Sequence, residues 1–512
     1  MKGIGLSGNR WRLAFVLLIF ILHASTVNGA QEKGTIRWAV TDWKTLDPAF
    51  LTLMNESAIA MNIYSGLVTY KYGGTEIVPD LAKSWEISKD GLTYTFRLRE
   101  KVKWHHGFGE FTAQDVKFTL ERLLDPKTKS FSAGSYKLLN KVNVVDKYTV
   151  QIILKEPHAP FLHLLTPYKA GGIVKKEAIE KWKEDYGMHP VGTGPFEWVS
   201  GDPRGDIVLK AFNDYYAGRS KIDKIVFIHI SEDSVAYAAF EGGDLDLVSV
   251  RSPEMLRQFQ SDSKMAVQTV VGLNLNYIVM NNSVKPFNDL KVRQAVNHAV
   301  NKQALLDTVL KGIGFDLTGP VPANANFYEP DVTKYPYNPE MAKKLLAEAG
   351  YPNGFSTTLY TYIAGPAVPV STAIQDQLKK VGIQAELKAL EIAAWQEVVK
   401  TGTAPLCYMR LTRPPDPHEF LNAVANSKSF PQWNFGRYSN PSVDGLIEEG
   451  RRESDPKKRK AIYSSIQKTI AQDAPNVWIF SDIIATAHRP YIKGFKIDPF
   501  WNHVLYPASI EK

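Results

Sequence analysis

Residues 77–122 constrain the fold of this chain more than any other stretch. Apolar and polar residues alternate there on both sides of a turn signal, and the apolar spacing then changes from a period of two to that of a helix. Asp90-Gly91 is a two-residue turn signal, since both residue types accept positive φ at low cost. Trp85 and Ile87 alternate with polar residues before this turn. Four apolar residues alternate with polar ones after it: Leu92, Tyr94, Phe96 and Leu98. The period of two predicts a β-hairpin with one apolar face.

The same stretch then predicts a helix. Thr112 has the chemistry of an N-cap residue, and Asp115 stands three positions later, as in a capping box. Apolar residues follow at helical spacing: Val116, Leu120, Leu123 and Leu124. We therefore expect a hairpin, a loop and a capped amphipathic helix.

Strand and helix patterns alternate through the rest of the chain. The expected strands are 34–40, 149–154, 207–211, 225–230, 273–281, 354–362 and 383–390. One helix is expected over 289–309, one from Asn338-Pro339 to Gly350, one that ends at Gly382, and one that begins at Asp455-Pro456. This alternation predicts open α/β sheets.

Composition excludes several function classes. The chain has 512 residues, enough for roughly two to four domains. Its formal net charge of +8 is small and dispersed, so we expect no nucleic-acid partner. Cys407 is the sole cysteine, which excludes an intrachain disulfide and a cysteine-based zinc site.

Enzyme motifs are also missing from the sequence. There is no G-x-S-x-G elbow and no Walker loop. His418-Glu419 begins like the metalloprotease motif H-E-x-x-H, but Asn422 stands at its fifth position. The histidines His105 and His106 are adjacent and point in different directions, so they make a poor metal pair, although a ligand role stays open. We expect no enzyme activity, no cofactor and no metal.

Residues 1–30 predict a cleaved signal peptide. Lys2, Arg10 and Arg12 precede ten apolar residues, 13–22, and small residues precede Ala30. Ten apolar residues are too few for a membrane span, which needs about twenty; an uncleaved anchor is the alternative. No cysteine stands near the end of the apolar run, so we expect no lipid modification of the N-terminus. We expect an exported, soluble protein, located in the periplasm if the source is a Gram-negative cell.

The string from Pro79 to Arg122 is similar to the hallmark segment of the dipeptide-, oligopeptide- and nickel-binding receptors of ABC importers, solute-binding protein family 5. It departs at His105-His106-Gly107, where the family usually has His-Asp-Gly. Further similar segments are 45–48, 64–68, 192–196, 243–247, 288–305 and 438–475. The resemblance therefore covers nearly all of the mature chain.

The resemblance implies an α/β fold of the large periplasmic-binding-protein (type II-like) class, with two α/β lobes, a hinge and an extra domain. The implied division is a signal peptide (1–30), lobe I in three parts (31–63, 192–273 and 484–512), extra domain II (64–191) and lobe III (274–483). The chain crossings near 273 and 484 would form the hinge.

The implied function is that of a periplasmic substrate-binding component. It would close its lobes around a peptide or peptide-like solute and deliver it to an inner-membrane ABC permease complex, acting as a monomer. One alternative is the same receptor role for a metal chelate, an opine-like anion or an oligosaccharide. A second is a secreted hydrolase with an unrecognised site.

Residues 410–421 are the most informative part of the implied ligand site, because their prolines hold the backbone extended. Arg413 stands where peptide-binding relatives hold the peptide amine with an aspartate, and His418 stands where nickel-binding relatives contact the metal. Asp416 would be an alternative anchor, or would neutralise Arg413. A structural salt bridge for Arg413 and a helix-capping role for His418 remain open.

Aromatic residues are the second part of that implied site. The chain has 11 Trp, 23 Tyr and 24 Phe residues, and aromatic side chains line the cleft in these receptors. Trp395, Tyr360 and Tyr362 lie in segments that would border it. Packing in the core is the alternative for each.

Overall fold

The computed structural model describes residues 34–501 and 504–511. The predicted signal segment 1–30 lies outside the described residues. No helix in the described part is long and apolar enough to cross a membrane.

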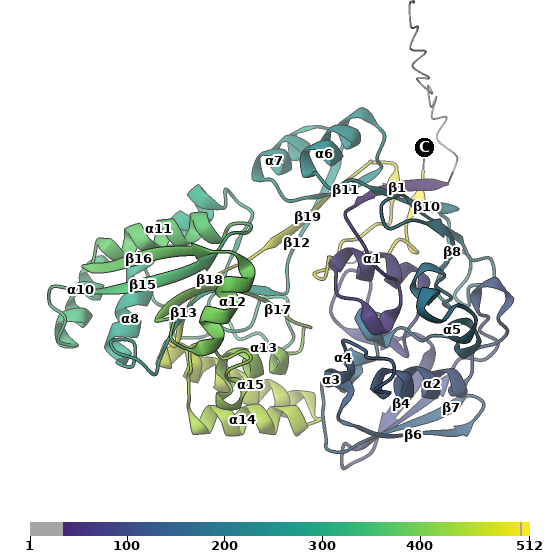
Figure 1. Cartoon of the computed structure of the whole chain (residues 1–512), viewed down its shortest axis with the longest axis horizontal. Coiled ribbons are helices and arrows are strands. Elements are labelled where there is room, and N and C mark those ends of the chain that lie inside the picture. The colour runs from purple at the N-terminus through teal and green to yellow at the C-terminus, as the bar shows by residue number, and fades with distance from the viewer. Residues whose placement is uncertain (1–33, 502–503, 512) are drawn as a thin grey trace, which may run out of the picture. The chain divides into compact units, whose positions relative to one another are not determined.

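The first of two large sheets has seven strands in the order β12-β19-β11-β1-β10-β9-β8 (Figure 1). Its strands are β1 (Thr35–Val40), β8 (Phe196–Gly201), β9 (Ile207–Ala211), β10 (Lys224–His229), β11 (Leu247–Val250), β12 (Ala266–Val271) and β19 (Ile483–His488). Its associated helices are α1 (Met54–Ile63), α6 (Asp233–Gly242) and α7 (Pro253–Ser261). β1 runs parallel to β10 and β11, as in other open α/β sheets.

The second large sheet has six strands in the order β14-β18-β13-β17-β15-β16. Its strands are β13 (Asn274–Met280), β14 (Phe315–Asp316), β15 (Phe355–Tyr362), β16 (Ile383–Leu390), β17 (Leu406–Thr412) and β18 (Asn476–Ser481). All seven residues of β13 are buried, because helices cover both faces of this sheet.

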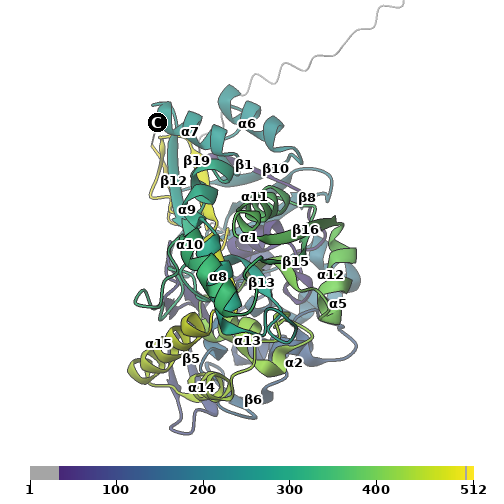
Figure 2. The same cartoon turned by 90° about the vertical axis from the view of Figure 1, so that its left-hand side faces the viewer.

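Two groups of helices cover those faces. The core on one face includes α8 (Leu290–Ala299), α10 (Pro339–Glu348) and α11 (Ala367–Lys379). The core on the other includes α12 (Ile392–Thr401), α13 (Pro417–Ala425), α14 (Pro441–Arg452) and α15 (Pro456–Asp473). α14 and α15 lie side by side (Figure 2).

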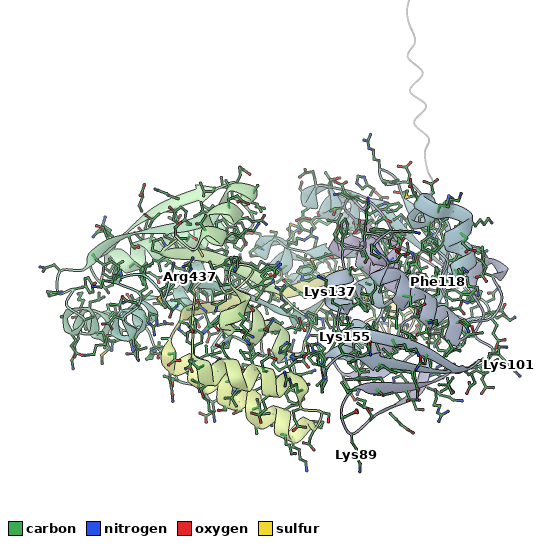
Figure 3. All side chains as sticks on the ribbon, turned by 60° about the horizontal axis from the view of Figure 1, so that its bottom comes forward. Lys89, Lys101, Phe118, Lys137, Lys155 and Arg437 are labelled. Atoms are coloured by element: carbon green, nitrogen blue, oxygen red, sulfur yellow. The ribbon has the colours of Figure 1, made fainter. Side chains whose placement is uncertain are left out.

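The predicted hairpin lies in a third sheet of four strands, in the order β4-β5-β7-β6. Its strands are β4 (Ala82–Ile87), β5 (Thr93–Leu98), β6 (Leu139–Asp146) and β7 (Thr149–Leu154), with α2 (Ala113–Leu124) following the hairpin. Gly91 has φ +69° in the turn, and the Thr112 N–H donates to the Asp115 carboxylate at 2.8 Å. Lys89, beside the turn, points outward (Figure 3). The hairpin and the capped helix are thus confirmed.

Two details of the predicted elements are wrong. Ile87 is 38% exposed, because β4 is an edge strand whose apolar residues are not all covered. The helix expected over 289–309 is interrupted: α8 ends at Ala299, and the Asn301 side chain accepts a hydrogen bond from the Ala304 N–H at 3.0 Å. An asparagine in this role starts a new helix rather than continuing the old one.

The remaining elements are short. They are β2 (Val68–Tyr70), β3 (Ile77–Pro79), α3 (Ala133–Tyr136), α4 (Phe161–Leu164), α5 (Lys176–Trp182), α9 (Lys302–Ala304), β20 (Ile492–Lys493) and β21 (Ser509–Ile510). A π-helix (Leu305–Val309) follows α9, and 3-10 helices lie at Pro48–Phe50, His105–Gly107, Lys169–Gly171, Lys183–Met188 and Ser427–Ser429.

The chain passes between the two large sheets at two points. The first lies between β12 and β13, at residues 272–273, and the second is Asp482, between β18 and β19. The two crossings are bonded to each other, because the Gly272 N–H donates to the Asp482 carbonyl at 2.8 Å. The Asp482 N–H in turn donates to the Asn274 side chain at 3.1 Å. This strand pairing supports the predicted division into lobes, which stays a prediction.

Candidate functional site

A cavity of about 470 Å³ lies beside the crossings, between the two large sheets. Asp482 and Ile483, from the second crossing and the start of β19, form part of its wall. The ends of β1 and β11 line it from the seven-stranded sheet, and β17 and β18 line it from the six-stranded sheet. The volume is within the range of small-molecule sites, roughly 300–1,000 Å³.

Two ion pairs supply the charged side chains of this cavity. On the seven-stranded sheet, Arg251 Nη1 donates to Asp233 at 2.8 Å. On the six-stranded sheet, Arg410 donates to one oxygen of Asp482 through Nε at 3.0 Å and Nη2 at 2.7 Å. Desolvation opposes the charge of Arg410, but the adjacent Asp482 carboxylate raises the pKa of its guanidinium on balance. Arg251 directly follows a strand of the seven-stranded sheet, whereas Arg410 lies in a strand of the six-stranded sheet.

The rest of the wall is mainly apolar and aromatic. Its larger members are Trp38, Met54, Pro366, Phe480 and Trp501. Such walls give contact area without dictating one ligand sequence, while the few polar groups orient the ligand.

Arg413, the first predicted site residue, follows the last residue of β17 and does not line this cavity. Its guanidinium stacks on Trp433 at 3.9 Å and donates to the Thr412 carbonyl at 3.0 Å. Burial lowers the pKa of Arg413. No ion pair of Arg413 is found among the described residues, so the structure does not support the salt bridge that the sequence left open as an alternative, and a ligand contact stays a prediction.

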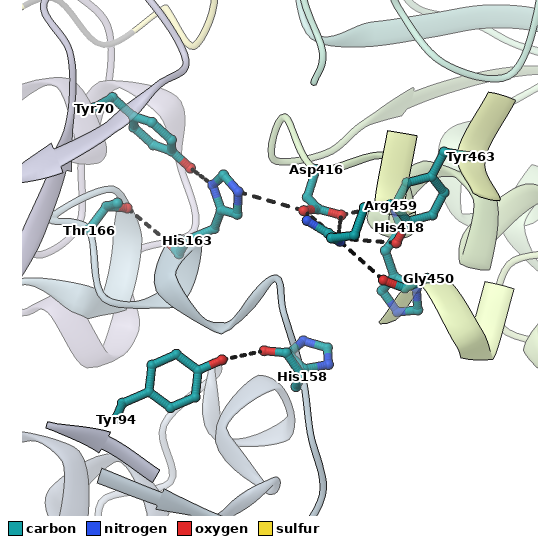
Figure 4. A network of polar contacts seen from close by, with 10 residues as sticks. All are labelled: Tyr70, Tyr94, His158, His163, Thr166, Asp416, His418, Gly450, Arg459 and Tyr463. Atoms are coloured by element: carbon teal, nitrogen blue, oxygen red, sulfur yellow. Dashed lines mark hydrogen bonds and ion pairs between the residues drawn. The ribbon is translucent and has the colours of Figure 1, made fainter. Parts of the chain in front are cut away.

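Asp416 is wholly buried and fully engaged (Figure 4). It caps α13 by accepting from the His418 N–H at 3.0 Å, and Arg459 Nη2 donates to both of its oxygens at 2.9 Å. Burial acts to raise the pKa of Asp416, but Arg459 and His163, whose Nε2 lies 3.8 Å away, hold it below its usual value. Asp416 therefore neutralises Arg459 rather than Arg413, and its geometry supports a structural role.

His418 lies in the first turn of α13, where Asp416 and not the histidine caps the helix. Its ring stands edge-on to His158 at 5.7 Å. Its Nδ1 is buried without a hydrogen-bond partner in the described part of the chain. Burial lowers the pKa of His418 to about 4 and that of His158 to about 3. A ligand contact for His418 stays a prediction.

Trp395 and Tyr362 pack against each other, with ring centroids 5.1 Å apart. Trp395 is 6% exposed and belongs to the core between the six-stranded sheet and α12–α15. Tyr362 also contacts Tyr408 at 5.7 Å. Neither lines the cavity, and the geometry favours the packing role that the sequence left open.

His105 joins two backbone segments. Its Nε2 lies 2.9 Å from the Gly194 carbonyl, and its Nδ1 is 3.3 Å from the Gly192 N–H. Burial lowers the pKa of His105 to about 3. His106 points elsewhere, 3.7 Å from Glu197. Over the described residues, no group of three or more His, Cys, Asp or Glu side chains could hold a metal ion.

Sequence reasoning missed the charged residues of the cavity. Arg251 and Asp482 each interrupt a run of buried strand residues: Arg251 directly follows β11, and Asp482 separates β18 from β19. A lone charge at the end of a buried strand was the available signal, because a charge there is rarely buried without a partner. Nothing local indicated that the two lie on one cavity.

Comparisons with known proteins agree with this architecture. The chain matches the family "Bacterial extracellular solute-binding proteins, family 5 Middle" over residues 76–432. The dipeptide-binding protein of Escherichia coli is 32% identical over an alignment of 481 residues that covers 89% of this chain and 90% of that protein. Heme-binding protein A of Haemophilus influenzae is 31% identical, over 89% of this chain and 88% of that protein.

Solved structures give the same result. HbpA2 from Haemophilus parasuis superposes with a TM-score of 0.87 at 29% identity, over 93% of this chain and all of that one. The ABC transporter-associated periplasmic binding protein DppA from Helicobacter pylori, in complex with the peptide STSA, gives 0.76 at 29% identity, over 94% and 98%. The predicted family and fold class are confirmed. The chain belongs to the bacterial extracellular solute-binding proteins of family 5.

Proposed function

We propose that this protein is the periplasmic substrate-binding component of an ABC importer, and that it captures peptides or peptide-like solutes in the cavity between the two large sheets. The observation that carries this proposal is the position of the cavity. Both sheets line it, beside the two bonded crossings of the chain. A ligand there touches both sides of a hinge, so its binding energy favours the closed arrangement.

The lobes in this proposal are those predicted from the sequence. Residues 31–63, 192–273 and 484–512 form lobe I, and 274–483 form lobe III, with 64–191 as the extra domain. Sheet membership supports the assignment, because β12 and β19 pair in one sheet while β13 and β18 pair in the other. Rotation at the crossings closes the cavity. The protein works as a monomeric receptor without bond chemistry and delivers its solute to the permease.

A second candidate is the same receptor role for a non-peptide ligand. The mainly apolar wall of the cavity favours it, as does the similarity to a heme-binding protein. Mass spectrometry of small molecules released from the purified protein separates the two candidates.

Small-angle scattering tests the closure itself. The radius of gyration should fall when a periplasmic small-molecule extract, or the ligand identified by mass spectrometry, saturates the protein. An unchanged profile at saturation would contradict closure. Intact mass of the periplasmic protein should lack the predicted signal segment; its retention, or recovery with membranes only, would contradict the localisation.

A further inference from the structure

We propose that the cavity selects ligands that join an apolar body to a carboxylate, and that Arg251 and Arg410 grip this carboxylate from opposite sheets. This inference rests on the proposed receptor function and names the ligand class of its site.

The two arginines have N–H donors to spare. Arg410 commits Nε and Nη2 to Asp482, and Arg251 commits Nη1 to Asp233. Within the described residues, Nη1 of Arg410 and both Nε and Nη2 of Arg251 make no hydrogen bond. A guanidinium has five N–H donors and binds carboxylates with two parallel bonds. Each arginine is therefore held in place by one carboxylate while it remains able to bind another.

The carboxylates of Asp482 and Asp233 have fewer free hydrogen-bond acceptors for a ligand than the arginines have free donors. One oxygen of Asp482 accepts both bonds from Arg410, and the other accepts from Asn276 Nδ2 at 2.9 Å. Asp233 lies beside Arg251 in the first turn of α6. The cavity thus presents unused donors in excess over unused acceptors, which favours an anionic group.

The backbone around the cavity also contributes positive partial charge. The first turns of four helices line the cavity: α1 through Met54, α6 through Asp233, α7 through Pro253 and α11 through its cap residue Pro366. A helix N-terminus carries a partial positive charge and unsatisfied N–H groups. Three of these ends carry a carboxylate in the first turn: Glu56 in α1, Asp233 in α6 and Glu254 in α7. The first turn of α11 has no acidic residue, so its N-terminus adds to the preference that the arginines set.

The apolar part of the ligand class follows from the wall. Met54, which is 43% exposed, and the partly exposed Ile483 and Trp501 would cover an apolar body of the ligand. A wholly polar anion would leave these surfaces exposed to water, and a neutral apolar molecule would leave the arginine donors unused.

The grip also couples binding to closure. Arg251 directly follows β11 of the seven-stranded sheet, and Arg410 lies in β17 of the six-stranded sheet, so the two arginines are attached to different large sheets. A carboxylate bound to both is held best when the sheets approach. A ligand that lacks the carboxylate loses both its anchor and part of its ability to favour the closed form.

Calorimetry with defined probes tests the proposal. The probes are leucyl-leucine, its C-terminal amide, its N-acetyl derivative, and hemin as an apolar dicarboxylate without an α-amine. We expect amidation to weaken binding by about 30-fold or more, as loss of a charge-assisted contact does, and N-acetylation not to weaken it. Binding of hemin alone assigns the carboxylate to a tetrapyrrole and supports the same grip.

Three variants complete the experiment. Arg251→Gln and Arg410→Gln should each weaken the carboxylate probes by about 30-fold or more and leave the amide unchanged. Arg251 is the more exposed, at 47% of its side chain, so its variant keeps the test valid if Arg410→Gln unfolds. Arg257→Gln is the matched control, because Arg257 is exposed on α7 and does not line the cavity.

Two outcomes would overturn the grip. One is equal affinity for acid and amide; the other is carboxylate binding that neither variant weakens. If no probe binds, the chemistry of the ligand released from the purified protein tests the proposal. A released ligand without a carboxylate overturns it. Absence of any bound or bindable small molecule would instead refute the receptor function itself.

Discussion

Asp416→Asn isolates the energy of the buried ion pair between Asp416 and Arg459. Asparagine has nearly the same shape and also caps helices well, so the substitution removes the charge and keeps the cap of α13. The carboxylate is 0% exposed and accepts from Arg459 twice at 2.9 Å. Removal of one partner of such a pair typically costs about 3–5 kcal/mol, because the other charge stays buried and uncompensated. We expect that loss here.

Two further variants make the magnitude specific. Asp416→Ala also removes the cap, worth roughly 0.5–2 kcal/mol, so it should lose more than Asp416→Asn. Asp455→Asn is the matched control: Asp455 also precedes a proline and caps α15, accepting from Lys457 N–H at 2.8 Å, but it is exposed. We expect a change within about 0.5 kcal/mol for it.

The assay is urea unfolding followed by circular dichroism at pH 7. A double variant, Asp416→Asn with Arg459→Met, should lose less than the sum of the two single changes, since it leaves no unpaired charge. A loss under about 1 kcal/mol for Asp416→Asn, or a simple sum in the double variant, would refute the reasoning that this buried pair is a structural element.

Three other changes have defined outcomes. Burial lowers the pKa of His418 to about 4 and that of His158 to about 3. Below about pH 6.5 both histidines therefore take up protons in the unfolded chain but not in the folded one. The free energy of unfolding should fall between pH 6.5 and 4 by up to about 1.4 kcal/mol per pH unit for each histidine. His418→Gln should reduce this slope in urea titrations, and an unchanged slope would contradict the argument. Gly192→Ala should lower stability by about 1–3 kcal/mol, because its Cβ would lie 2.0 Å from the Ile63 carbonyl oxygen; a melting temperature equal to that of the wild type would count against this packing. Arg413 has no carboxylate partner in the described chain, so it should repel the free amine of a peptide. In calorimetry, Arg413→Asp should shift the binding preference from N-acetylated peptides toward free peptides. A wild-type preference for free amines that persists in Arg413→Asp would exclude a role of Arg413 in ligand selection.

The sequence predicted the elements whose signals are local. Asp90-Gly91 and the alternation after it define the hairpin, and Thr112 with Asp115 defines the start of α2, within a few residues of each other in the chain. The prediction of one continuous helix over 289–309 was wrong. The apolar spacing continues across Asn301, but the side chain of Asn301 caps the next turn and starts a new helix. Periodicity cannot register that competition.

The site was less predictable because its partners are distant in sequence. Asp416 was expected near Arg413, three residues away, but its partner is Arg459, which belongs to α15. Arg251 and Arg410 meet one cavity only through the order of the strands in two sheets. Spacing along the chain carries no information about such pairs. The resemblance to the solute-binding family pointed instead to the loop at residues 410–421.

The position of β19 sets a condition on how this protein can fold. β19, residues 483–488, lies between β12 and β11 and pairs with both, although more than 200 residues separate it from them in the chain. During synthesis β11 and β12 therefore expose unpaired backbone on the edge that faces β19 until residues 483–488 have been made. Such non-local pairing is slow and prone to aggregation. Of the two large sheets, the seven-stranded one is thus completed last, and the emerging chain stays incompletely folded until β19 has been made.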